Sequence, residues 1–329
     1  MPLISVVITV YNKEPFLKKC LDSVINQTLT DIEIICVDDG STDNSLEILH
    51  QFSSKDKRIN VISQENSGQS AARNKGLFEA NGEYVIFIDA DDYAELNMLE
   101  NMYNAAKEFG ADTVICGFNQ FNDKEIIPHT GLDSLLEKTP ISKQDIDEII
   151  VKNLFTLKVA AGVHNRIFLR EMLINNNILF DTTLLFMEDY LYNVDVCNVS
   201  NCQVILHDKY YYYRTASDGT VSTGISIQKL NSFLDLYTIL KTKISCNISK
   251  EFDFWAFFCL YILTCSYFSN ANKNDFLSFC RCEKIRQIVK GKHVLSTVIA
   301  NKTTFKQKLS MIFYYIAFRC NKLFNLKLH

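Results

Sequence analysis

The sequence predicts an α/β fold, with a mostly parallel sheet that carries helices on both faces, followed by a helical C-terminal region. Two observations predict it. Short apolar runs alternate with segments of helical period along the first 117 residues, and such alternation is typical of right-handed βαβ units. The apolar runs are also unbroken by polar residues, as expected of strands that are buried on both faces of a sheet.

The alternation yields five strands and four helices in order. The expected strands are Leu3–Val10, Ile32–Val37, Asn60–Ser63, a run that starts at Tyr84, and Thr113–Gly117. The expected helices are one in which Leu17, Leu21, Val24 and Ile25 recur, then Leu46–Phe52, Ala71–Ala80 and Leu96–Phe109. Apolar residues recur at helical spacing in the first of these helices, which predicts one buried face for it.

The period changes beyond Phe118, where the chain is loop-like through Thr139. A helix is then expected to open at Ser142-x-x-Asp145, a box-like start. Further on we expect helices at Asn165–Asn175 and Glu188–Val199, strands within Val204–Tyr213, and helices almost throughout from Ile225. We therefore expect a catalytic domain at 1–220, with a nucleotide-binding half at 1–120 and an acceptor half at 121–220, and a helical region at 221–329.

Composition sets the broad class of the protein. The chain has 329 residues and 47% apolar residues, which is ample for a globular core. No apolar stretch reaches the roughly 18 residues that span a bilayer, and no signal segment opens the sequence, so we expect a cytoplasmic protein. The eleven cysteines contain no C-x-x-C pair, and we expect reduced thiols in the core.

Three carboxylates follow the strand that starts at Tyr84. Asp89, Asp91 and Asp92 lie within four residues, and ligands of open α/β sheets gather beyond the carboxyl ends of the strands. Such acids repel one another, which favours a divalent cation between them. A spacing of two puts Asp89 and Asp91 on one face if the strand continues, and Ala90 leaves room for a ligand. Alternatively the acids lie in a loop in which Asp92 caps the next helix.

Two other strands bring polar residues to the same edge. The first strand runs into Thr9–Glu14 and the second into Asp38-Asp39. Tyr11 can stack on a base, Asp39 can accept a hydrogen bond from an imide N–H, and the third strand's carboxylates can hold a metal that binds phosphates. These are the requirements of a nucleoside diphosphate. Because the chain has no Gly-rich phosphate loop, metal and basic side chains would have to hold the phosphates.

These motifs together resemble one known family. SVVITVYN, VDDGSTDNS, NSGQSAARNKG and FIDADD occur in this order over the first 120 residues, and MEDYLYN at 187–193 extends the match to about 200 residues. The chain resembles the inverting, family-two glycosyltransferases of the type-A, Rossmann-like fold that act on bacterial surface polysaccharides. The resemblance implies a UDP-sugar donor and a Mn²⁺ or Mg²⁺ cofactor.

The resemblance also implies roles for single residues. Thr9 and Tyr11 would contact the base, Glu14 the ribose, Asp39 the uracil imide, Arg73 the uridine or diphosphate, Asp89 the ribose side, with Ala90 beside it, and Asp91 the metal. Without the resemblance, Asp38-Asp39-Gly40-Ser41 reads as a solvated turn before a capped helix, and Arg73 as a surface charge on a helix.

A catalytic base is implied at the Glu188-Asp189 pair. In a single displacement the acceptor hydroxyl attacks opposite the departing nucleotide, so a carboxylate must accept its proton there. We choose Asp189 for this role and Glu188 for support of the donor or acceptor; the alternative is a pair of acids that cap a helix. Arg214 could bind the diphosphate through paired donors. His164-Asn165 departs from the tryptophan and lysine that many relatives carry there, which leaves the acceptor open.

The resulting hypothesis is a metal-dependent enzyme that transfers sugar from a UDP-sugar to a hydroxyl of a glycan acceptor with inversion. The acceptor would be a lipid-linked oligosaccharide in the synthesis of a bacterial surface polysaccharide. Two alternatives stay open. One is a protein that binds a nucleotide sugar without turnover, and the other is a nucleotidyltransferase, which would need the missing phosphate loop. We expect no nucleic acid partner, and the sequence does not predict the donor sugar, the linkage or the oligomeric state.

Charge is distributed unevenly along the chain. Residues 1–283 hold 24 basic residues against all 38 acids, whereas 284–329 hold 10 basic residues and no acid. From Phe305 to Phe324 apolar residues recur on one face of a helix, flanked by Lys and Arg. This pattern is typical of a helix that lies on an anionic membrane surface, which would place the enzyme at the inner face of the cell membrane. The alternative is a terminal helix packed on the acidic body.

Overall fold

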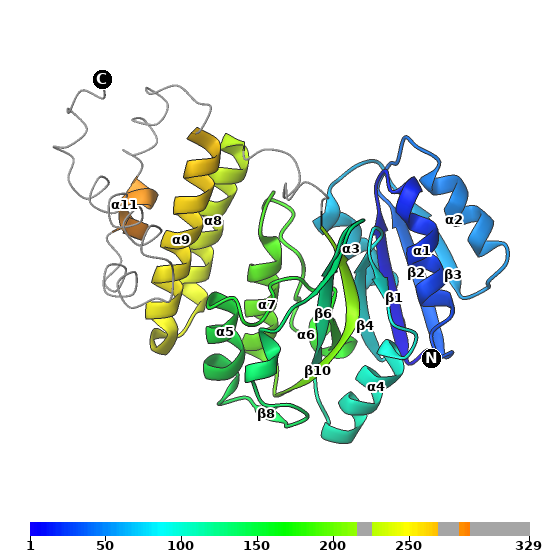
Figure 1. Ribbon diagram of the computed structural model, residues 1–329, viewed down its shortest axis with the longest axis horizontal. Coiled ribbons are helices and arrows are strands. Elements are labelled where there is room, and N and C mark those ends of the chain that lie inside the picture. Colours follow the sequence, from blue (N-terminus) through cyan, green and yellow to red (C-terminus); the bar gives the residue numbers. More distant parts are fainter. Residues whose placement is uncertain (216–225, 269–282, 290–329) are drawn as a thin grey trace.

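The computed structural model describes residues 1–215, 226–268 and 283–289 (Figure 1). Its strands are β1 (Ile4–Val10), β2 (Ile32–Asp38), β3 (Ile59–Ser63), β4 (Tyr84–Asp89), β5 (Tyr93–Ala94), β6 (Thr113–Phe121), β7 (Ile126–Pro128), β8 (Ile141–Ser142), β9 (Arg166–Leu169) and β10 (Cys202–Arg214). Its α-helices are α1 (Glu14–Ile25), α2 (Ser45–Ser53), α3 (Gln69–Glu79), α4 (Met98–Phe109), α5 (Lys152–Phe155), α6 (Arg170–Asn175), α7 (Glu188–Val199), α8 (Ile227–Lys243), α9 (Ser249–Phe268) and α11 (Glu283–Val289).

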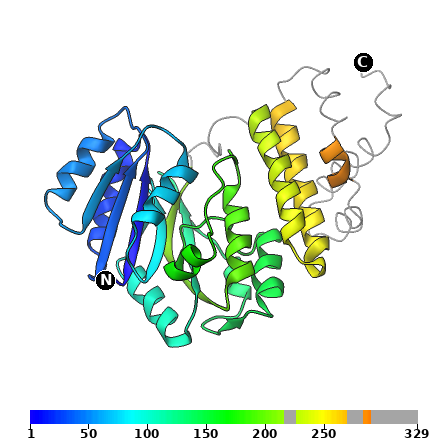
Figure 2. The same ribbon diagram turned by 180° about the vertical axis from the view of Figure 1, so that it is seen from behind.

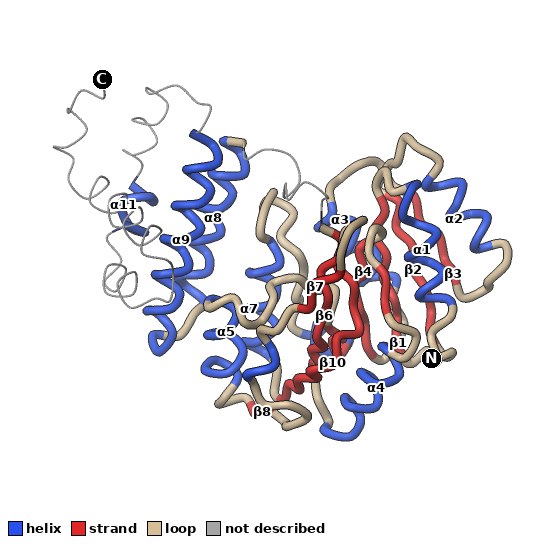
Figure 3. The backbone as a smooth tube through the Cα atoms, viewed as in Figure 1, coloured by secondary structure: helices blue, strands red, loops and turns tan. Residues whose placement is uncertain are grey.

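One mixed sheet forms the centre of the molecule. Its strand order is β3-β2-β1-β4-β9-β6-β10-β5, with β7 on β6 and β8 on β10. The pairs β1–β2, β1–β4, β2–β3 and β6–β10 are parallel, which confirms the predicted mostly parallel α/β sheet. β6 and β10 are the longest strands, and β7 folds back on β6 (Figure 3).

Both faces of the sheet are covered, as the unbroken apolar strands predict. In β1, Ile4, Val6 and Ile8 pack in a core with α1, α2 and α4, whereas Val7 packs in a second core with α3, α6 and α7. Successive side chains of a strand point to opposite faces, so an apolar strand serves two cores at once. The register places Thr9 beside both Val37 and Asp89. The ends of β1, β2 and β4 therefore lie side by side, as predicted.

The C-terminal helices form a third core with the middle of the chain. α8 and α9 lie side by side at the end of the molecule away from β1, β2 and β3 (Figures 1 and 2). Trp255 of α9 is buried against Phe155 of α5 and Tyr190 of α7, at ring-centroid distances of 5.1 and 4.7 Å. α7 carries the Glu188-Asp189 pair in its first turn, so this aromatic packing holds in place the helix on which the predicted base lies.

Two stretches of the chain differ from their predicted secondary structure. The segment expected to be loop-like through Thr139 contains β7. Arg166–Leu169, expected to be helical, is β9, which runs antiparallel between β4 and β6, and the helix begins only at Arg170. The three apolar residues of this strand are too few to distinguish helix from strand by their period alone. The alternative in which Asp92 caps α4 is also wrong, because that helix begins at Met98. Asp92 is instead 2% exposed and accepts a hydrogen bond from Tyr211 of β10.

No helix among residues 1–215, 226–268 and 283–289 is long and apolar enough to cross a membrane. The predicted basic tail, the helix expected from Phe305 to Phe324, lies outside these residues.

Candidate active site

A cavity of about 1240 Å³ opens at the carboxyl ends of β1, β2 and β4. Seven of the residues predicted from sequence line it, namely Thr9, Tyr11, Asp39, Asp89, Ala90, Asp91 and Arg214. Small-molecule sites usually measure about 300–1,000 Å³, so this cavity has room for more than a nucleotide. The other four predicted residues, Glu14, Arg73, Glu188 and Asp189, lie outside its lining.

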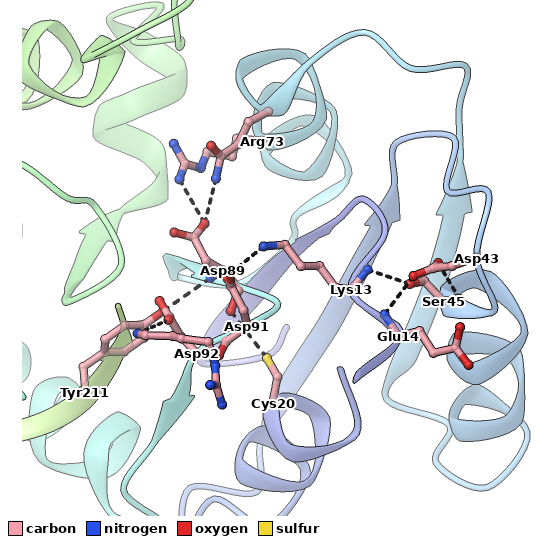
Figure 4. Close-up of polar contacts among 12 residues, drawn as sticks. Lys13, Glu14, Cys20, Asp43, Ser45, Arg73, Asp89, Asp91, Asp92 and Tyr211 are labelled. Carbon is pink, nitrogen blue, oxygen red and sulfur yellow. Dashed lines mark hydrogen bonds and ion pairs between the residues drawn. The ribbon is translucent and has the colours of Figure 1, made fainter. Parts of the chain in front are cut away.

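Glu14 contacts the neighbouring loop instead of the cavity. Its Oε1 accepts a hydrogen bond from Asn44 Nδ2 at 2.8 Å. Its backbone N–H donates to Asp43 Oδ2 at 3.0 Å (Figure 4). These bonds hold the start of α1 against the start of α2. A ribose contact by Glu14 stays a prediction. Tyr11, by contrast, is 47% exposed in the cavity lining, where a base could stack on it.

Asp39 is held by three donors from the loop before α3. Its carboxylate accepts hydrogen bonds from Gln64 Nε2 at 2.8 Å and from the backbone N–H groups of Ser67 at 2.8 Å and Gly68 at 2.9 Å. Gly68 has a φ of 89°, a conformation that side chains other than hydrogen disfavour. Asp39 is 3% exposed, and these three donors hold its carboxylate in place.

Arg73 joins the strand ends to α7. Its guanidinium donates to Asp89 Oδ1 at 3.0 Å, to Asp189 Oδ1 at 2.9 Å and to Glu188 Oε1 at 3.4 Å. In Figure 4 Arg73 reaches from α3 directly over Asp89. Arg73 is 2% exposed, so it is not the surface helix charge that the sequence allowed. Burial disfavours the charged form of Asp89, but Arg73, together with His164 and Lys13, outweighs burial and keeps the pKa of Asp89 below its usual value.

The two acids of α7 stay accessible although they face Arg73. The side chains of Glu188 and Asp189 are 16% and 22% exposed. Burial raises the pKa of Asp189 to about 7, and the Arg73 charge partly opposes this rise. The preceding residue, Met187, has a φ of 62°, which is uncommon for a side chain of its size. Helix α7 therefore begins directly after a strained residue. Asp189, in its first turn, can exchange a proton near neutral pH.

Asp91 lines the cavity two residues beyond Asp89. Its Oδ2 accepts from Lys13 Nζ at 2.5 Å, and its backbone carbonyl accepts from Arg214 Nε at 3.3 Å. The Arg214 guanidinium lies over the rings of Phe16 and Phe121, at 4.4 and 4.6 Å. This stacking holds the Arg214 guanidinium in the cavity lining beside Asp91.

A second group of possible metal ligands joins Asp89 of the cavity lining to two buried residues. Ligand atoms of Asp89, Asp92 and His164 lie within 4.8 Å of one another. Burial lowers the pKa of His164 to about 4, so the ring is neutral and able to ligate, and its Nε2 is buried without a hydrogen-bond partner. Burial, together with Asp89 and Asp91, raises the pKa of Asp92 well above its usual value. Asp92 accepts hydrogen bonds from Tyr211 Oη and from the Arg214 backbone N–H, both at 2.7 Å, so both of its oxygens are already engaged.

The chain matches the family model described as glycosyl transferase family 2 over residues 5–174. The chain belongs to glycosyl transferase family 2. This glycosyltransferase is 35% identical to the uncharacterized glycosyltransferase EpsJ of Bacillus subtilis over 65% of the chain and 61% of that protein. It is 34% identical to the poly(ribitol-phosphate) beta-glucosyltransferase of Bacillus spizizenii over 66% of the chain and 33% of that protein. The match thus spans less than two thirds of either relative.

Solved structures share the fold of this glycosyltransferase. S. aureus TarS 1-349 superposes with a TM-score of 0.71 at 19% identity, over 97% of this chain and 90% of that one. TarS structures with UDP and with UDP-GlcNAc match at TM-scores of 0.67 and 0.61. A Pyrobaculum calidifontis mannosyltransferase in complex with GDP-Man and Mn²⁺ matches at 0.57, at 15% identity over 99% of this chain and 88% of that one. At these identities the likeness shows the fold alone, and it confirms the type-A architecture.

Sequence reasoning missed several residues of this site. Lys13 reaches Asp91 although the sequence predicted no role for it, and its position directly after the SVVITVYN motif was the available signal. The hairpin between β6 and β7, expected to be loop, supplies a whole wall of the cavity: Gln120, Asn122, Asp123 and Glu125. Nothing in its polar sequence indicated that wall, because the strands that form it pair only in the folded sheet.

Proposed function

We propose that this glycosyltransferase moves a sugar from a UDP-sugar to a hydroxyl of a glycan acceptor by metal-dependent single displacement with inversion. The observation that carries the proposal is the Arg73 bridge, which ties the donor-side acid Asp89 to the accessible acids Glu188 and Asp189. The bridge holds Asp189, whose pKa burial raises to about 7, on the same guanidinium as Asp89. The UDP and UDP-GlcNAc complexes of TarS support a uridine donor.

In this proposal the two sides of the cavity do different work. Thr9, Tyr11 and Asp39 hold the nucleotide, and Arg214 lies beside the diphosphate. Asp189 accepts the proton of the acceptor hydroxyl as that oxygen bonds to the anomeric carbon, and the bond to the UDP oxygen breaks on the opposite face. Arg73 favours the ionised form of Asp189 and holds its carboxylate by the same guanidinium that holds Asp89. Glu188 lies at the same guanidinium and contributes to its position.

A divalent cation fits the Asp91 side. Carboxylate oxygens are the ligands that Mn²⁺ and Mg²⁺ take, and the Asp91 carboxylate is 27% exposed in a cavity that already holds a cation, the Lys13 ammonium. When bound, the ion neutralises charge on the departing diphosphate. The Mn²⁺ complex of the Pyrobaculum mannosyltransferase supports metal use in this fold. We keep Asp91 as the proposed ligand and both ions as candidates.

Screening of donors tests the function. UDP-Glc, UDP-Gal, UDP-GlcNAc and UDP-GalNAc would each be incubated with Mn²⁺, with Mg²⁺ or with EDTA, and UDP release measured. We expect one or two donors to release UDP, and only with a metal. GDP-Man serves as a control for the nucleobase, since it carries guanine and Asp39 would have no uracil imide to bind. UDP release that is as fast in EDTA as in Mn²⁺ would contradict the metal role.

The pKa of Asp189 predicts a pH dependence. A base acts only when ionised, and Asp189 is protonated below about pH 7. We therefore expect kcat/KM to rise about tenfold per pH unit below that pH and to level off above it. The measurement is kcat/KM for the best donor between pH 5.5 and 8.5, with the residual activity of Asp189→Asn as a control that should lack the rise. A flat profile down to pH 5.5 would exclude Asp189 as the titrating base.

For the biological role we propose synthesis of a bacterial surface polysaccharide on a lipid-linked acceptor. The likeness to the poly(ribitol-phosphate) beta-glucosyltransferase supports a cell-envelope glycan.

For the domains we keep the proposed boundary near residue 220. β10 ends at Arg214 and α8 begins at Ile227. The described residues of the helical region, 226–268 and 283–289, nevertheless share a core with the 121–220 half, so the two parts are expected to unfold together.

The basic tail is proposed to bind an anionic membrane surface, which would bring a peripheral enzyme to a lipid-linked acceptor. Each basic residue near anionic lipid contributes about 1 kcal/mol. Truncation after Asn301 should abolish co-sedimentation with phosphatidylglycerol vesicles at low salt and leave UDP affinity unchanged. Neutral phosphatidylcholine vesicles are the control. If the full-length chain ignores anionic vesicles, or truncation abolishes UDP binding, the tail is a structural part of the body.

A further inference from the structure

Lys13 lies where a metal ion would meet Asp91. Its Nζ is 2.5 Å from Asp91 Oδ2, and within the described part of the chain this is the one ion pair of that carboxylate. Both side chains line the cavity and are partly exposed, at 33% for Lys13 and 27% for Asp91. The negative charge of Asp91 is thus balanced by an ammonium that faces the ligand space (Figure 4).

The backbone of Lys13 is fixed, but its side chain can turn. The Lys13 backbone N–H donates to Ser45 Oγ at 2.9 Å. The preceding Asn12 has a φ of 52°, and its Oδ1 accepts from the Thr42 backbone N–H at 2.8 Å. The loop is therefore pinned to the start of α2 on the side away from Asp91. A lysine stem of four methylenes can move its charge by several ångströms without any shift of this loop.

An ammonium and a divalent ion compete for Asp91. Metal–oxygen bonds measure about 2.0–2.6 Å, so an ion on Asp91 would lie within about 5 Å of the Lys13 charge, where like charges repel strongly at a low dielectric. Lys13 and Arg214 are the basic residues of the cavity lining. Arg214 is stacked between Phe16 and Phe121, which leaves Lys13 as the lining cation that can follow an incoming anion.

We propose that Lys13 is a built-in counter-ion of the metal site. In the empty enzyme its ammonium holds Asp91; when a nucleoside diphosphate arrives with a divalent cation, the cation takes Asp91 and Lys13 turns to the diphosphate oxygens. This proposal rests on the proposed function, which assigns the metal to Asp91. Its consequence is a coupling between the two ligands. The metal binds weakly alone and tightly with the nucleotide, and each ligand raises the affinity for the other by the same factor.

The test measures Mn²⁺ affinity by electron paramagnetic resonance of free Mn²⁺, with and without UDP. Lys13→Met keeps the stem and removes the charge. We expect it to bind Mn²⁺ without UDP about tenfold more tightly than the parent, because one nearby positive charge is gone. The factor by which UDP strengthens Mn²⁺ binding should fall by about the same amount. Lys18→Met, the same change at an exposed position on α1, should alter neither quantity.

Asp91→Asn separates the possible failures. In that background Lys13→Met should not restore Mn²⁺ binding, because the carboxylate ligand itself is gone. Equal Mn²⁺ affinities of the parent and Lys13→Met without UDP would overturn the counter-ion role, while Mn²⁺-dependent UDP binding would leave the proposed function intact. If the parent binds no Mn²⁺ even with UDP, both proposals are wrong. Melting temperatures verify that each variant is folded.

Discussion

Asp189→Asn should bind UDP as tightly as the parent and lose sugar transfer by about 10²-fold or more, the usual contribution of a positioned base. The amide has the size of the carboxyl group but cannot take the acceptor's proton. UDP binding should be unaffected because Asp189 lies outside the lining of the cavity and is linked to the lining residue Asp89 through Arg73. UDP affinity would be measured by calorimetry, and transfer by UDP release in the presence of donor and acceptor.

A matched control lies on the same helix. Asp195→Asn makes the same chemical change six residues along α7, where the carboxylate pairs with Lys243. This variant should keep transfer within about twofold, since a partly exposed ion pair contributes only about 0–1 kcal/mol to stability. Transfer by Asp189→Asn within a few fold of the parent would remove Asp189 from the role of base. Equal losses in both variants would instead indicate damage to α7 as a whole.

The first half of the fold could be predicted because its signals are local. Each apolar run between residues 3 and 117 is bounded by turn residues and followed by a helical period, so the strands β1 to β4 and β6 follow from short windows of sequence. β9 could not be predicted in this way. Its four residues are stable as a strand only because β4 and β6 pair with them from both sides, and those partners are distant in the sequence.

The site shows the same division between local and distant information. The strand ends that carry Thr9, Asp39 and Asp89 were predictable from the alternation of strands and helices. The contact between Arg73 and Asp189 joins residues 116 apart, and that between Lys13 and Asp91 joins residues 78 apart. No periodicity contains such pairs. The resemblance placed Arg73 and Asp189 in one site, but only the folded chain shows that one buried guanidinium holds both acids.

The structure offers two arrangements for a metal, and their chemistry differs. Asp91 faces the cavity, and among the described residues its ion-pair partner is the Lys13 ammonium. In the group of Asp89, Asp92 and His164, Asp92 is 2% exposed and accepts hydrogen bonds from Tyr211 Oη and from the Arg214 backbone N–H, both at 2.7 Å. A metal at Asp92 would have to break these bonds, whereas a metal at Asp91 displaces a side chain that can turn away. This comparison favours Asp91.

Asp91→Asn should therefore abolish the part of UDP affinity that depends on metal, because an anionic oxygen ligand becomes a neutral amide. We expect the Kd for UDP in Mn²⁺ to equal that in EDTA, and transfer to fall by about 10²-fold or more, since a bound Lewis acid contributes several kcal/mol. His164→Gln is the discriminating comparison. It removes the imidazole of the group of Asp89, Asp92 and His164 and leaves Asp91 intact, so Mn²⁺-dependent UDP binding should persist in it. If His164→Gln loses that binding and Asp91→Asn retains it, the metal belongs to that group and Asp91 serves only as the partner of Lys13.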